Sequence, residues 1–181
     1  MGLSLMLAGV ALTFFWSAGV RQRLQGSRAD IVQAFAQLDQ QLQARHQVLA
    51  EVLEAARKGW PSAHDATERV AAARMQLMAA ADLVRARPAT AGPIKTLDLA
   101  ETSLNTALVG LAAWVDAVQV PVVLEAAQKL APCGQRVRFA ALACNQRLDQ
   151  YNDAVQRLPT RWVAGLMRHR VLPVLTVFSH G

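Results

Sequence analysis

The chain has 181 residues, a hydrophobic content of 53% and a formal net charge of +6. This length suits one domain with a sizeable core, and a composition rich in Ala, Leu and Val with sparse aromatics argues against an all-β fold. From residue 130 onward, seven arginines stand against two aspartates, a net charge of +5. Such a basic end favours anionic partners, phospholipid headgroups or nucleic acid, and an Arg-rich solvated surface is the simpler alternative.

The first 20 residues carry no charged side chain. A helix of this length spans about 30 Å, close to the hydrocarbon thickness of a bilayer. We therefore expect a single transmembrane helix within an anchor and basic flank, residues 1–27. A signal peptide and a buried core helix are the alternatives, although the positive n-region of a signal peptide is missing.

The residues that flank this segment predict its orientation. Trp16 suits the membrane interface, and Arg21, Arg23 and Arg28 follow it directly. Under the positive-inside rule, we expect Met1 outside and the rest of the chain in the cytoplasm.

Proline and glycine divide the remaining sequence into helices. In each helix, apolar residues recur at alternating four- and three-residue steps. Four such helices joined by short loops predict an all-α fold, an antiparallel up-and-down four-helix bundle with coiled-coil-like packing. We expect the bundle over residues 28–159 and a separate amphipathic or apolar tail over 160–181. The four helices are expected at about 28–58, 62–87, 94–118 and 132–158.

Two charged residues interrupt these apolar series, Arg45 in the first helix and Glu101 in the third. If the first and fourth helices pack antiparallel, Arg45 of the first helix lies at the same height along the bundle as Cys144 of the fourth. Our hypothesis is that Asn145 and Asp149 meet the guanidinium there, because a buried charge needs a partner. Alternatively, Arg45 extends to solvent from the edge of the core.

Asn145 and Asn152 lie seven residues apart beside the apolar face of the fourth helix, where Asn is a mediocre helix former. We expect both to serve a structural polar network rather than a reaction. Asn152 is predicted near Asp39 or a backbone group at a helix end.

No catalytic site is predicted. The four histidines are far apart, and no zinc, phosphate-loop or nucleophile motif accompanies them. Cys133 and Cys144 have no second metal ligand at zinc spacing and are expected to be core residues. The sequence therefore predicts no enzyme, no cofactor, no metal and no nucleic-acid partner.

The segment from Arg161 to Phe178 interleaves arginines with apolar residues. It is expected to lie in the membrane interface, with Trp162, Arg168 and Arg170 as contacts, or to fold back and close the end of the bundle. These two arrangements stay open.

The first and third helices carry a family pattern. Residues 31–51 read IVQAFAQLDQQLQARHQVLAE, followed by a Lys58-Gly59-Trp60 stop, and residues 100–108 read AETSLNTAL. Residues 151–166 read YNDAVQRLPTRWVAGL, with Cys144-Asn145 one heptad before. With these elements, the chain resembles the LemA family of bacterial membrane proteins. The family's DLIPN element is replaced by Gln47 to Glu51. The matching positions of the first helix are Ala34, Phe35, Leu38, Asp39, Leu42, Arg45 and His46.

The resemblance implies a helical bundle on a single-pass anchor in the bacterial inner (cytoplasmic) membrane. It also implies a scaffold or adaptor whose partner is a membrane-associated protein, for example of a protease system, and it leaves a homo-oligomer open. Direct membrane shaping by the anchor and the basic tail is the alternative function.

Overall fold

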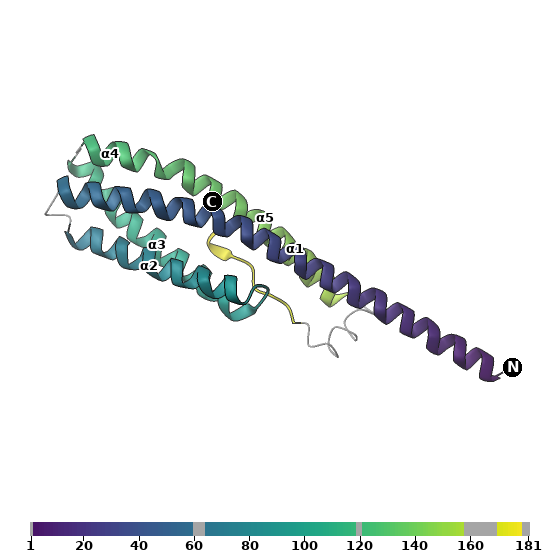
Figure 1. Cartoon of the computed structure of the whole chain (residues 1–181). Coiled ribbons are helices and arrows are strands. Elements are labelled where there is room, and N and C mark those ends of the chain that lie inside the picture. The colour runs from purple at the N-terminus through teal and green to yellow at the C-terminus, as the bar shows by residue number, and fades with distance from the viewer. Residues whose placement is uncertain (1, 60–63, 119–120, 158–169, 179–181) are drawn as a thin grey trace.

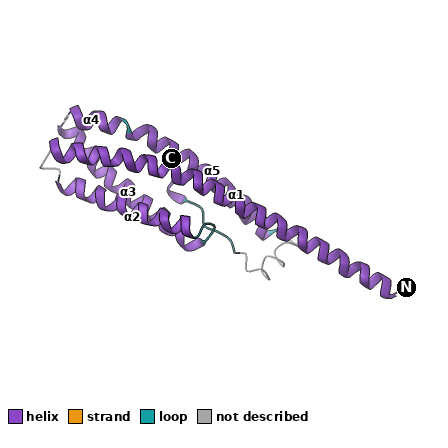
Figure 2. Cartoon of the chain, in the orientation of Figure 1, coloured by secondary structure: helices purple, strands orange, loops and turns teal. Residues whose placement is uncertain are grey.

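The computed structural model describes residues 2–59, 64–118, 121–157 and 170–178. Side chains at 2–15, 17, 59, 114–118, 122–123, 126–127 and 178 lie outside this description. The secondary structure of the described residues is entirely helical (Figure 2). The helices are α1 (Gly2–Gly59), α2 (His64–Ala86), α3 (Ala91–Val118), α4 (Pro121–Gln128), α5 (Leu130–Gln156) and the short 3-10 helix η2 (Thr176–Phe178).

The four long helices, α1, α2, α3 and α5, form the predicted antiparallel bundle (Figure 1). Their bounds differ little from the expected ones, because proline and glycine end the helices where the sequence indicated. One difference is that α3 begins at Ala91 and takes Pro93 into its first turn, where a missing N–H costs nothing. The other is that α4 is a separate helix before α5.

Helix α1 is one continuous helix of 58 residues, where we expected an anchor helix and a separate first bundle helix. At 1.5 Å per residue it is about 87 Å long, so its N-terminal part projects well beyond the bundle (Figure 1). In the described part of the chain, no helix combines the length and apolar character needed to cross a membrane. The predicted transmembrane segment falls largely on side chains outside that description.

The core consists of the predicted apolar series of all four helices. The series is buried along α1 from Ile31 to Ala56 and along α5 from Val137 to Val155. The core is larger than expected, because Leu24 of α1 and two residues of the C-terminal segment, Leu172 and Leu175, belong to it. The core therefore crosses both predicted domain boundaries, at residues 28 and 160.

The sides of the bundle differ in how closely the helices pack. Helix α1 packs along α5, and α2 packs along α3, as the main helix pairs. Among the described residues, α3 and α5 make far fewer contacts with each other, and η2 contacts both of them. The C-terminal segment, residues 170–178, thus lies in a gap between α3 and α5.

Candidate functional site

Two asparagines of α5 face this gap. Asn145 is buried and Asn152 is partly buried, each directly after or beside a core position of the helix. An Asn carboxamide has an acceptor and a donor side by side, as a peptide group of a β-strand partner does. Because both asparagines lie beside the core, their side chains can bind the backbone of a chain segment that packs along α5.

Each asparagine binds the main chain of one leucine through two hydrogen bonds. Asn145 accepts from the Leu175 N–H at 2.8 Å and donates to the Leu175 carbonyl at 2.9 Å. Asn152 accepts from the Leu172 N–H and donates to the Leu172 carbonyl, both at 2.8 Å. We call these four bonds the asparagine clamp. All four main-chain groups of the two leucines are thereby paired, as burial requires.

The other wall of the gap holds the end of the segment. Asp98 of α3 accepts from the Thr176 hydroxyl at 2.5 Å and from the Val177 N–H at 3.1 Å. The segment is therefore bound by side chains of both helices, and Leu172 and Leu175 fill the core between them. Of the two arrangements predicted for the tail, residues 170–178 adopt the folded-back one.

The predicted partner of Arg45 was wrong. Arg45 is buried, 5% exposed, and it pairs with Glu101 of α3 through two hydrogen bonds, with Nη1 to Oε1 at 2.7 Å. Asn145 instead binds Leu175, and Asp149 is exposed on α5. The prediction failed because it considered only the adjacent helix, whereas the pair spans the core diagonally from α1 to α3. The buried Nε of Arg45 has no hydrogen-bond partner among the described residues, so the guanidinium depends on Glu101.

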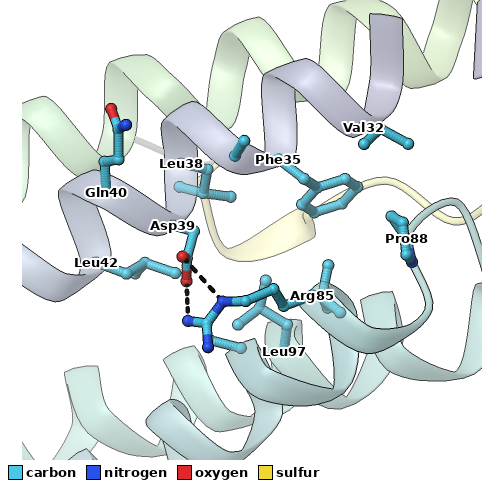
Figure 3. Close-up of a pocket in the computed structure, with 12 residues that line it drawn as sticks. Val32, Phe35, Leu38, Asp39, Gln40, Leu42, Arg85, Pro88 and Leu97 are labelled. Atoms are coloured by element: carbon cyan, nitrogen blue, oxygen red, sulfur yellow. Dashed lines mark hydrogen bonds and ion pairs between the residues drawn. The ribbon is translucent and has the colours of Figure 1, made fainter. Parts of the chain in front are cut away.

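Of the two partners predicted for Asn152, Asp39 was wrong. Asn152 binds a backbone group, as the alternative had it, but that group belongs to Leu172 of the C-terminal segment and not to a helix end. Asp39 of α1 forms a bidentate pair with Arg85 of α2, with Oδ1 at 2.8 Å from Nη2 and Oδ2 at 3.2 Å from Nε. Figure 3 shows this pair at the edge of a pocket of about 280 Å³. The pocket is lined mainly by apolar side chains, including Phe35 and Leu97.

A comparison with sequence models of protein families tests the resemblance to the LemA family. The sequence model of the LemA family matches residues 34–180. The chain belongs to the LemA family. A comparison with curated proteins gives no match.

The LemA-like positions of α5 now have structural roles. The asparagines of Cys144-Asn145 and Tyr151-Asn152, which the resemblance singled out, are the two clamp residues. Tyr151, next to Asn152, is 1% exposed, and burial raises the pKa of its hydroxyl. Cys144 is fully buried, and burial raises the pKa of its thiol to about 12. It remains a neutral core side chain, as predicted.

The LemA-like His46 of α1 contacts another helix. Arg74 of α2 donates from Nε to His46 Nδ1 at 2.9 Å. Burial, and then the nearby charge of Arg74, lower the pKa of His46 below its usual 6.5. His46 is therefore a neutral acceptor for an arginine, which is a packing role. Among the described residues, no group of three His, Cys, Asp or Glu is placed to hold a metal ion.

Four of the predicted membrane-contact residues are described. Trp16, Arg21 and Arg23 are exposed on α1, and Arg170 is exposed at the start of the C-terminal segment. Trp162 and Arg168 lie outside the described residues. The structure thus leaves these four side chains accessible and does not bring them into one cluster with the clamp.

Proposed function

We propose that this LemA-family protein is a membrane-tethered, non-enzymatic helical scaffold that presents its bundle to a membrane-associated protein. The observation that carries the proposal is the continuity of α1. The uncharged residues 2–20 and the core residues from Leu24 to Ala56 belong to one helix (Figure 1). An anchor built in this way positions the bundle directly at the membrane surface.

The buried polar groups support a scaffold rather than an enzyme. Arg45 is paired with Glu101, Asn145 with the main chain of Leu175, and Thr67 with the carbonyl of His64. The first pair joins α1 to α3, the second joins α5 to the C-terminal segment, and the third lies within the first turn of α2. The alternative function, membrane shaping through a basic tail, has less support, because Leu172 and Leu175 are buried in the bundle.

The anchor is tested by placing charge in it. The double substitution Leu7→Arg and Val10→Arg puts two arginines near the middle of residues 1–20, at a cost of about 2.5–3.5 kcal/mol each for insertion. We expect the wild-type chain to stay with the membrane after carbonate extraction and the variant to be released. Gln22→Arg, in the basic flank, is the matched control and should remain bound. Release of the wild-type chain would contradict the proposal.

The scaffold role is tested by crosslinking the full chain in native bacterial membranes. We expect a protein partner to be crosslinked through the bundle, and the Leu7→Arg, Val10→Arg variant to lose it. Recovery of the chain without any crosslinked protein contradicts the scaffold role.

A further inference from the structure

The asparagine clamp recognises main-chain groups and no side chain. The four hydrogen bonds of Asn145 and Asn152 go to N–H and C=O groups that every non-proline residue carries. The clamp therefore specifies the path of a bound segment and not its sequence. This is the same use of main-chain hydrogen bonds that gives affinity when a peptide adds to a sheet edge.

The spacing of the clamp selects an extended segment. Seven residues of α-helix advance about 10.5 Å, and three residues of extended chain span about 10 Å. Asn145 and Asn152 are seven residues apart, and Leu175 and Leu172 are three apart. The two asparagines thus match an extended chain that runs antiparallel to α5.

The side chains of the segment supply its selectivity. Leu175 is 0% exposed and Leu172 is 6% exposed, whereas the intervening Val174 is only partly buried. Asp98 adds a preference for a hydroxyl residue directly after the second leucine. The bound pattern is two aliphatic residues three apart, followed by Ser or Thr.

A shallow, solvent-open pocket of about 440 Å³ borders the bound segment on the surface of α5. It is lined by Val174 and by α5 side chains that include Leu142, Asp149 and Asp153, and both carboxylates are exposed. Asp153 already pairs with a cation, Arg157, at 3.5 Å. A cationic side chain longer than Val174 would therefore extend over an acidic surface.

We propose that the α3–α5 gap is a peptide-binding site, which residues 170–178 occupy as a built-in ligand. Its partner ligand is an extended segment of another protein, with aliphatic residues at the positions of Leu172 and Leu175, Arg or Lys at that of Val174, and Ser or Thr at that of Thr176. The inference rests on the proposed scaffold function and names the element by which the partner docks. The chain's own segment competes with the partner, because it is tethered to the site.

The test uses the full chain in detergent micelles and fluorescently labelled peptides, with anisotropy as the readout. The tail-weakened variant Leu172→Ala, Leu175→Ala should bind the peptide RVLPVLTVF, and RVLPRLTVF more tightly. Tethering raises the effective concentration of the native segment, so wild type should bind either peptide about 100-fold more weakly. Asn145→Ala and Asn152→Ala, added to the tail-weakened variant, should abolish binding, whereas Gln135→Ala on the exposed face of α5 should not.

A control peptide, methylated on the amide nitrogen of the second leucine, tests the main-chain hydrogen bond alone. It keeps every side chain but loses the donor to Asn145, so its binding should fall about tenfold or more. If the methylated peptide binds as tightly as the unmethylated one, the site does not recognise the main chain of its ligand, and the proposal is overturned.

Absence of binding to the tail-weakened variant overturns the proposal, provided that circular dichroism shows native helix content. If that variant unfolds, Leu175→Ala alone, which keeps Leu172, takes its place in the same test. Exchange of C-terminal segments between two wild-type copies, seen as a dimer on gel filtration that the peptide dissociates, overturns the partner assignment in favour of a second copy. Carbonate extraction reports on the anchor separately, so failure of this inference is distinct from failure of the scaffold function.

Discussion

The Arg45–Glu101 pair and the asparagine clamp are both buried polar groups of one core, but they hold different kinds of partner. Arg45 binds one carboxylate, that of Glu101 on the diagonally opposite helix α3. Asn145 and Asn152 bind main-chain groups, which any extended segment offers. The first contact fixes the positions of α1 and α3, whereas the second allows the occupant to change while the bundle stays folded.

The largest expected effect comes from breaking the fixed contact. Glu101→Ala leaves the Arg45 guanidinium buried without a partner and should lower the free energy of unfolding by about 3–5 kcal/mol, measured by urea denaturation. Asp149→Ala is the control, because this exposed carboxylate should change stability by less than about 0.5 kcal/mol. A loss below about 1 kcal/mol in Glu101→Ala contradicts the buried pair.

Breaking the clamp should cost less. Asn145→Ala removes two hydrogen bonds to Leu175 and leaves buried main-chain groups unpaired, which should lower the free energy of unfolding by about 1–3 kcal/mol. Asn152→Ala should cost less than Asn145→Ala, because Asn152 is only partly buried. Urea denaturation of both variants beside Gln135→Ala checks the order, and a larger loss in Asn152→Ala counts against it.

The Asp39–Arg85 pair is a solvent-exposed counterpart of the buried Arg45–Glu101 pair. The Arg85 side chain is 49% exposed and that of Asp39 is 22% exposed, so solvent screens their attraction. Arg85→Ala should change the free energy of unfolding by at most about 1 kcal/mol, although its geometry is as good as that of Arg45. Thermal denaturation is the measurement. If Arg85→Ala loses as much stability as Glu101→Ala, burial does not explain why one ion pair should contribute more than the other.

The smallest effect concerns pH. The pKa of His46 is lowered in the folded protein, so the unfolded chain binds the proton more readily. The stabilising contribution of neutral His46 is therefore complete above pH 6.5 and is lost as the pH falls through the lowered folded pKa. His46→Gln should flatten the fall in stability between pH 7 and pH 5, as followed by urea denaturation at each pH. An unchanged slope rules out His46 as the titrating group.

The bundle could be predicted from the sequence because its signals are local. The apolar series of α2 and α5 name the buried residues directly, and Pro88 and Gly59 mark helix ends. The continuity of α1 could not be predicted in the same way, since Gly19 and Gly26 lie at the junction between the uncharged segment and the bundle. Glycine weakens a helix, yet both residues are helical in α1.

The polar contacts were predicted less well, for two physical reasons. Arg45 and Glu101 were both recognised as interruptions of apolar series, and their opposite charges were the available signal that they pair across the core. The partners of Asn145 and Asn152 are main-chain groups, which leave no trace in the sequence. Only the two leucines three residues apart, matched to two asparagines seven apart, could have indicated that contact.

Hydrogen exchange of the full chain, followed amide by amide by NMR, tests most directly whether the asparagine clamp holds the C-terminal segment. We expect the amides of Leu172 and Leu175 to be protected in the wild-type chain. In the Asn145→Ala, Asn152→Ala variant, both should exchange rapidly while the core amides of α2 stay protected. Rapid exchange of the Leu172 and Leu175 amides in the wild-type chain would show that the asparagine clamp does not hold the segment.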